Sequence, residues 1–171
     1  LRGWDFQSQD LRQAKLIAAD LSSANLRGVR LQDADLRGAA MSRADFAFAD
    51  LRGSEHSDNL PKGVRNLILP DGNATEVDVL TDETWTIFDH TLPIQVSDTA
   101  QFANGSVIEL QFEDTDWGST LHFDEGVSLT ETTLKLAPQS FDLATSLVGI
   151  TLQIIHWPNE TDNREVFAEV Q

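Results

Sequence analysis

The chain has 171 residues, a net charge of −16 and no cysteine. The absence of cysteine excludes disulfides and thiolate chemistry, and the acidic balance argues against nucleic acid as a partner, because binding phosphates requires a positive surface. No apolar run approaches the roughly 20 residues that a membrane-spanning helix needs.

Large apolar residues stand at every fifth position from residue 1 to residue 51. A small residue precedes most of these centres by two positions, and Asp or Asn often directly precedes them, as in Ala34-Asp35-Leu36. A period of five fits neither a helix, at 3.6, nor a strand, at 2. It fits a chain that turns a corner every five residues and directs one large side chain inward per side. The predicted repeat centres are Leu1, Phe6, Leu11, Leu16, Leu21, Leu26, Leu31, Leu36, Met41, Phe46 and Leu51.

This pattern resembles that of the pentapeptide-repeat family over residues 1–53. The resemblance implies a short right-handed quadrilateral β-helix, in which four sides make a coil of twenty residues and residue n lies beside residue n+20. On the position before each centre, opposite charges would then face each other on neighbouring coils. The two predicted columns of this kind are Asp10–Arg30–Asp50 and Lys15–Asp35.

The opening of the chain departs from the pattern in two ways. Trp4 and Gln9 stand where small inward residues are expected, which predicts that the opening coil is distorted or lies outside the regular tube. Leu1 is already a repeat centre, so we expect the sequence to be a piece of a longer chain.

The charge balance changes sharply after the repeats. Residues 1–53 carry eight Lys or Arg against seven Asp, whereas residues 54–171 carry four against 21 Asp or Glu. This shift predicts a repeat domain at 1–53, a junction at 54–63 and an acidic all-β domain at 64–171. An open coil end would expose backbone groups to edge pairing, so we expect residues from 54 onward to cover the end near Leu51.

Alternation of apolar and polar residues replaces the five-residue period in the acidic half. The predicted strands are 76–79, 85–88, 107–112, 120–123, 133–136, 149–154 and 165–170. Their spacing and the turn signals between them favour an antiparallel β-sandwich, with a looser β-solenoid that continues the first half as the alternative.

The stretches 107–112, 116–121, 133–137 and 147–152 resemble the β-rich segments that precede the sorting tail of exported bacterial proteins of the PEP-CTERM type. That resemblance implies an extracellular or cell-surface location, with the cytoplasm as the alternative.

Residues able to support chemistry are sparse. The histidines share no metal-ligand spacing, and the stretch from Ser54 to Asp58 collects hydrolase-type residues without the geometry that defines a triad. Asp114 and Asp116 are the best candidate calcium ligands in the sequence, because hard cations prefer clustered oxygens. The turn from Asp71 to Thr75 is a weaker candidate. We therefore predict no catalytic residue, and no cofactor unless calcium binds.

These observations favour a non-catalytic structural or interaction module of an exported or surface bacterial protein, with a protein or a surface as its partner. A calcium- or glycan-binding β-sandwich is the alternative. A third hypothesis follows from the family resemblance, because some pentapeptide-repeat proteins inhibit topoisomerases by mimicking DNA. The repeat here is short and nearly neutral, whereas mimicry needs a long acidic rod.

Overall fold

The computed structural model describes residues 1–56, 59–60, 62–112, 121–124, 127–129, 131–138, 151–154 and 166–169. The chain divides into two compact units, Leu1–Val77 and Asp78–Gln171. All regular structure in the described ranges is β-structure, and they contain no helix that is long and apolar enough to cross a membrane.

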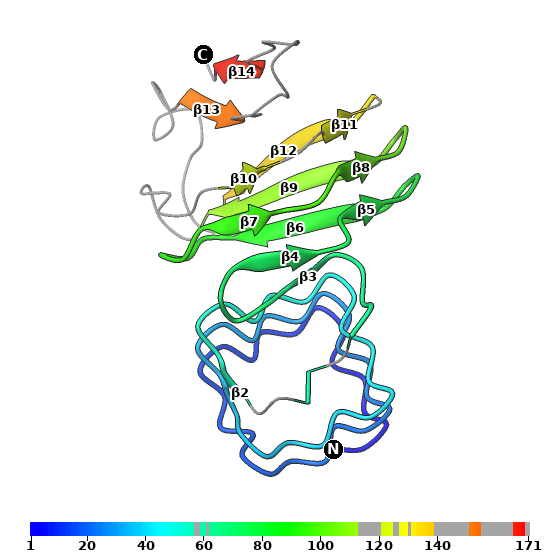
Figure 1. Ribbon diagram of the computed structural model, residues 1–171, viewed down its shortest axis with the longest axis vertical. Coiled ribbons are helices and arrows are strands. Elements are labelled where there is room, and N and C mark those ends of the chain that lie inside the picture. The colour runs from blue at the N-terminus through cyan, green and yellow to red at the C-terminus, as the bar shows by residue number, and fades with distance from the viewer. Residues whose placement is uncertain are drawn as a thin grey trace. The chain divides into compact units, whose positions relative to one another are not determined.

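The first unit is a β-helix with coils of twenty residues. Parallel bridges join residue n to residue n+20, for example Asp5 to Asn25 and Arg30 to Asp50. Strand β1 (Asp35–Leu36) pairs with β2 (Glu55–His56) at the same offset. Figure 1 shows these coils, coloured blue to cyan, lying one behind another around a four-cornered tube. The coil predicted from the five-residue period is confirmed.

Each corner of the tube is a tight β-turn that begins at a repeat centre. The N–H three residues after the centre donates to the centre's carbonyl, as in Gln9 to Phe6 at 2.9 Å. The third residue of each turn has a positive φ, and most of these residues are not glycine. Its N–H is thereby turned toward the next coil, and Ser8 donates to the Arg27 carbonyl at 2.9 Å. The positive-φ positions are 3, 8, 13, 18, 23, 28, 33, 38, 43, 48 and 53.

Where Asp or Asn precedes a centre, its side chain caps the turn that follows, as these two examples show. Its Oδ1 accepts the N–H of the residue two positions later, at 3.1 Å from Asp5 to Gln7 and 3.0 Å from Asp45 to Ala47. Short side chains that accept hydrogen bonds from nearby backbone are favoured in such turns. The recurrence of Asp and Asn before the centres therefore has a local structural cause.

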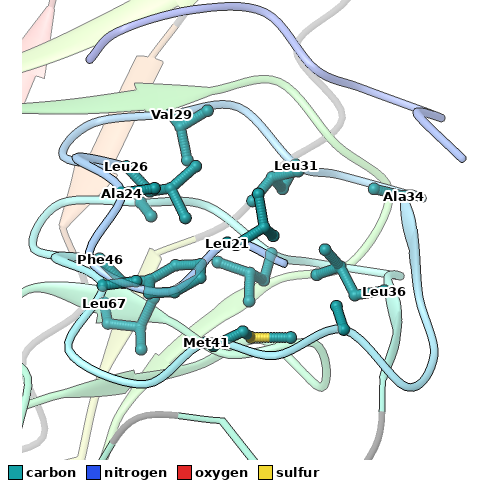
Figure 2. Close-up of a cluster of buried hydrophobic side chains, with 14 residues drawn as sticks. Leu21, Ala24, Leu26, Val29, Leu31, Ala34, Leu36, Met41, Phe46 and Leu67 are labelled. Atoms are coloured by element: carbon teal, nitrogen blue, oxygen red, sulfur yellow. The ribbon is translucent and has the colours of Figure 1, made fainter. Parts of the chain in front are cut away.

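The repeat centres fill the tube. From Leu21 to Leu51 every predicted centre is buried, and the alanines that precede the centres fit beside them. Figure 2 shows these side chains converging from successive coils. Phe6, Leu11 and Leu16 of the first coil pack against the same cluster but are only partly buried, and Leu1 is 40% exposed.

The distortion expected for the opening coil is absent. The backbone at Trp4 and Gln9 makes the regular turn bonds, and Asp5 bridges to Asn25 in register. Trp4 is instead 59% exposed, with its ring 5.9 Å from that of Phe6. The coil keeps its path because its backbone bonds do not depend on a small residue at these two positions.

A short hairpin closes the other end of the tube. Strands β3 (Leu67–Ile68) and β4 (Asn73–Thr75) pair antiparallel, and Leu51 N–H donates to the Ile68 carbonyl at 2.9 Å. Leu67 is fully buried in the same cluster as the repeat centres (Figure 2). The expected covering of the tube end is thus supplied from within the first unit, which extends to Val77.

The second unit is built mainly from parallel strands. Within the described residues, β5, β8 and β11 form one sheet, β6, β9 and β12 a second, and β7 pairs with β10, all in parallel. These strands lie side by side in Figure 1. Their bounds are Asp78–Val79 for β5, Thr84–Phe88 for β6, Ile94–Val96 for β7, Ala100–Phe102 for β8, Val107–Phe112 for β9, Leu121–Phe123 for β10, Val127–Leu129 for β11 and Thr133–Pro138 for β12.

The antiparallel sandwich is therefore the wrong prediction for the described residues between 78 and 138, and the looser β-solenoid describes them. Inward and outward residues alternate in both folds, so alternation alone could not separate them. Apolar side chains such as Trp85, Phe102 and Phe123 are buried inside this second solenoid. The two remaining strands, β13 (Thr151–Ile154) and β14 (Val166–Glu169), pair antiparallel.

Replacing Arg43 by glycine should stabilise the first unit by about 0.5–1 kcal/mol. An L-residue with positive φ costs about 1–2 kcal/mol, of which the extra chain entropy of glycine offsets part. Ser42, exposed in the same turn without a positive φ, is the matched control, and Ser42→Gly should be destabilising. Urea unfolding of both variants measures the difference; equal effects would contradict the role assigned to the left-handed position.

Replacing Leu67 by alanine should destabilise the first unit by about 2–5 kcal/mol, because it opens a cavity where the hairpin seals the tube. Ile17, which is 55% exposed, provides the control, and Ile17→Ala should change the free energy of unfolding by less than about 0.5 kcal/mol. Thermal unfolding followed by circular dichroism would test this, and a Leu67→Ala variant as stable as the parent would show that the hairpin does not close the tube.

Candidate interaction face

The tripeptide Asp-Leu-Arg occurs at three corners of the first unit and makes an ion pair at each. The centre points inward, so the residues before and after it both point outward and can meet. The shortest Arg–Asp nitrogen-to-oxygen distances are 2.8 Å for Arg12–Asp10, 2.5 Å for Arg37–Asp35 and 2.6 Å for Arg52–Asp50.

Two of these pairs belong to one face, which becomes more buried from coil to coil. Asp10 is 44% exposed in its side chain, whereas Asp50 and Arg52 are 1% and 0% exposed. Arg30 lies 3.4 Å from Asp10, and Gln32 Nε2 donates to Asp50 Oδ2 at 2.9 Å. We call this set, Asp10, Arg12, Arg30, Gln32, Asp50 and Arg52, the polar ladder.

The buried end of the polar ladder has a structural role. Removing either member of a buried pair would leave an uncompensated charge, which is strongly destabilising. Asp50 also accepts the backbone N–H of Arg52 at 3.1 Å, so both partners are held to the corner turn. Side chains with 1% exposure or less have no area to offer a ligand.

The third pair lies on a face that stays exposed. Arg37 and Glu55 are 58% and 65% exposed in their side chains, and Arg37 Nε lies 3.1 Å from Glu55 Oε2. Arg37 thus bridges Asp35 on its own coil and Glu55 on the next. Ile17, 55% exposed, occupies the position of Arg37 one coil earlier. We call Lys15, Ile17, Asp35, Arg37 and Glu55 the exposed face.

The ion pairs shift the pKa values of Asp35 and Arg37 on the exposed face. Hydrogen bonds from the Arg37 side chain, and to a lesser degree the Arg37 backbone N–H and the charges of Arg37 and Lys15, hold the pKa of Asp35 below its ordinary value. The same contacts, with the charge of Glu55, raise the pKa of Arg37. Asp35 and Arg37 therefore carry full charges at neutral pH.

Of the two charge columns predicted from the register, Asp10–Arg30 is confirmed as an ion pair. Lys15 and Asp35 are bridged by backbone, yet the direct partner of Asp35 is Arg37. The twenty-residue register predicts contacts between stacked coils and does not predict the contacts within one turn. The recurrence of Asp-Leu-Arg was the available signal.

The candidate metal ligands gain no support. Asp114 and Asp116 lie outside the described residues, so calcium binding there stays a prediction. In the weaker candidate, both carboxylate oxygens of Asp71 accept hydrogen bonds from Asn73, at 3.0 and 2.7 Å. Within the described ranges, no three His, Cys, Asp or Glu residues come together as a metal site would require.

The hydrolase-type residues do not form a triad in the part that the structure describes. Ser54 is buried in the inward position before the next corner, whereas Glu55 faces Arg37. His56 follows in β2 and is exposed. Ser57 and Asp58 lie outside the described residues.

The comparison with protein families supports the reading of the first unit. A model of pentapeptide repeats matches residues 5–43 and 19–55, with eight copies. A search of curated proteins finds no match for the chain. The resemblance of residues 64–171 to the PEP-CTERM type stays a prediction.

Asp35 should make stability depend on pH in the acid range. Its folded pKa lies below the ordinary value of 3.8, so its contribution is complete above that pH and is lost as the pH falls through the folded pKa. In Asp35→Asn the free energy of unfolding should be lower at neutral pH and should fall less steeply on acidification. Asparagine can still cap the turn, as Asn25 does for Arg27 at 3.2 Å.

Urea unfolding between neutral pH and about pH 3 measures both slopes. Arg37→Gln serves as the matched variant, since it removes the partner and should flatten the same part of the profile. Parallel profiles for the parent and Asp35→Asn would contradict the assigned pair.

Proposed function

Residues 5–55 belong to the pentapeptide-repeat family, and on that premise we propose that the chain is a non-catalytic structural module that binds a protein or a surface component through its exposed face. The observation that carries the proposal is the Arg37 bridge, which holds the charged groups of two coils in place while leaving them accessible. Repeat proteins commonly bind through such regular faces.

The exposed face combines features that binding requires. Its backbone is fixed by hydrogen bonds to both neighbouring coils: Asp35 N–H donates to the Ala14 carbonyl and Glu55 N–H to the Ala34 carbonyl, each at 2.9 Å. A preorganised surface loses little entropy on binding. Arginine is enriched among the residues that dominate binding energy, and Ile17 adds apolar area next to it.

We place this module on an exported or surface protein of a bacterium, with the cytoplasm as the alternative. The absence of cysteine and the strongly acidic second half are compatible with export. Fractionation of the producing cells, with detection in the medium and envelope, tests the location.

We do not extend the proposal to DNA mimicry. In the first unit, the carboxylates before the centres do not form continuous rows, because Asn25, Arg30 and Ala40 interrupt their columns. A DNA mimic needs an extended negative surface.

Calcium binding stays the alternative function, and a melting temperature unchanged by millimolar calcium would argue against it.

Charge reversal on the exposed face should abolish binding without unfolding the chain. The experiment immobilises the full chain and applies solubilised envelope proteins of the producing cell. We expect Arg37→Glu with Ile17→Asp to reduce the amount of a saturably bound component at least about tenfold. Ser42→Asp, on another exposed face, is the control and should retain it. Equal retention by all three proteins, with unchanged circular dichroism, would refute the exposed face as the binding surface.

A further inference from the structure

The chain contains one Asn-Gly pair, Asn104-Gly105, at a corner of the second unit. Ser106 N–H donates to the Ala103 carbonyl at 3.0 Å, which closes a tight turn with Asn104 and Gly105 at its exposed tip. Gly105 has φ near +80°. From this geometry we infer that Asn104 is a site of spontaneous covalent modification, through a succinimide, that alters the second unit with time.

The reaction needs only water and hydroxide. The backbone nitrogen of Gly105 gives its proton to hydroxide and attacks Cγ of Asn104. A C–N bond forms and the Cγ–Nδ2 bond breaks. The departing nitrogen takes a proton from water, which regenerates the hydroxide, and leaves as ammonia. Water then opens the five-membered imide at either carbonyl, which leaves aspartate or isoaspartate. Glycine favours the attack because it has no Cβ to obstruct the approach of its nitrogen.

The turn leaves both reacting groups accessible. The side chain of Asn104 makes no hydrogen bond within the described part of the chain. Gly105 N–H donates to the Glu131 carbonyl, but the nitrogen-to-oxygen distance is 3.4 Å, which is longer than in an ordinary N–H to oxygen hydrogen bond. These contacts therefore do not prevent the Gly105 nitrogen from approaching Cγ of Asn104.

A second candidate turn in the chain lacks these features. At Asp71-Gly72 the same imide could form with loss of water, but Gly72 is buried and its N–H donates to the Leu69 carbonyl at 2.9 Å. Both Asp71 oxygens accept hydrogen bonds from Asn73. The Asn73 amide is itself engaged, and Ala74 follows it. Asn73 is therefore the internal reference for Asn104.

The products disturb the corner at which the coils stack. Asp82 and Glu131 are the residues with positive φ on the turns either side of Gly105, and Asp82 Oδ1 lies 3.4 Å from the place that a Cβ on Gly105 would take. A new carboxylate at residue 104 adds negative charge there. Isoaspartate also adds a backbone methylene just before β9, which is paired on both sides.

The test incubates the full chain at mildly alkaline pH and body temperature and maps its peptides by mass spectrometry. We expect amide-to-acid conversion about tenfold faster at Asn104 than at Asn73, with isoaspartate as a product. Asn104→Thr is the matched control, since Thr81 holds the equivalent place on the preceding turn, and this variant should lack the conversion. Conversion no faster at Asn104 than at Asn73 would overturn the proposal.

The effect on stability is measured separately. The aged parent should melt at a lower temperature than fresh protein, whereas aged Asn104→Thr should not change. Asn104→Asp isolates the added charge from the isomerised backbone. An aged parent with high isoaspartate content and an unchanged melting temperature would contradict the claim that the modification alters the second unit.

Discussion

The left-handed third residue of each corner turn is the constraint on which the rest of the structure depends. It bends the chain sharply enough at each corner for a coil to close, and it turns an N–H toward the neighbouring coil. The same device recurs in the second unit, where Asp82, Gly105 and Glu131 take positive φ at successive turns of one corner. Two solenoids with different coil lengths thus share one way of turning. Backbone hydrogen bonds rather than side-chain identity hold the path, so Trp4 and Gln9 are tolerated in the first coil.

The first unit could be predicted from sequence because its geometry imposes a fixed five-residue repeat on the sequence. A corner every five residues repeats the same inward and outward positions, so the coil length and the inner columns follow from counting. Contacts within one turn produce a less regular sequence pattern. Asp35 pairs with Arg37 two residues away, and Arg37 with Glu55 eighteen residues away, neither at the offset of the coil. The exposed face was therefore not visible in a comparison of stacked positions.

The second unit could not be predicted in the same way, because its coils differ in length. Thr84 pairs with Val107 and Val107 with Thr133, offsets of 23 and 26 residues, so no fixed period marks the chain. Alternation predicts longer strands such as 107–112. Short ones such as β7 and β8 carry too few residues for alternation to be read. Parallel pairing is a relation between distant segments, and nothing local distinguishes it from the antiparallel pairing of a sandwich.

Burial decides what a recurring motif does in this protein. Asp50-Leu51-Arg52 and Asp35-Leu36-Arg37 have the same sequence order, the same turn and similar ion-pair distances. The first pair is withdrawn from solvent, so its charges serve only each other and the fold. The second is reached by solvent, and its guanidinium is shared with Glu55 on the next coil. A tripeptide pattern can therefore identify an ion pair in advance, but only the exposure of that pair tells whether the charges stabilise the coil alone or are also available to a partner.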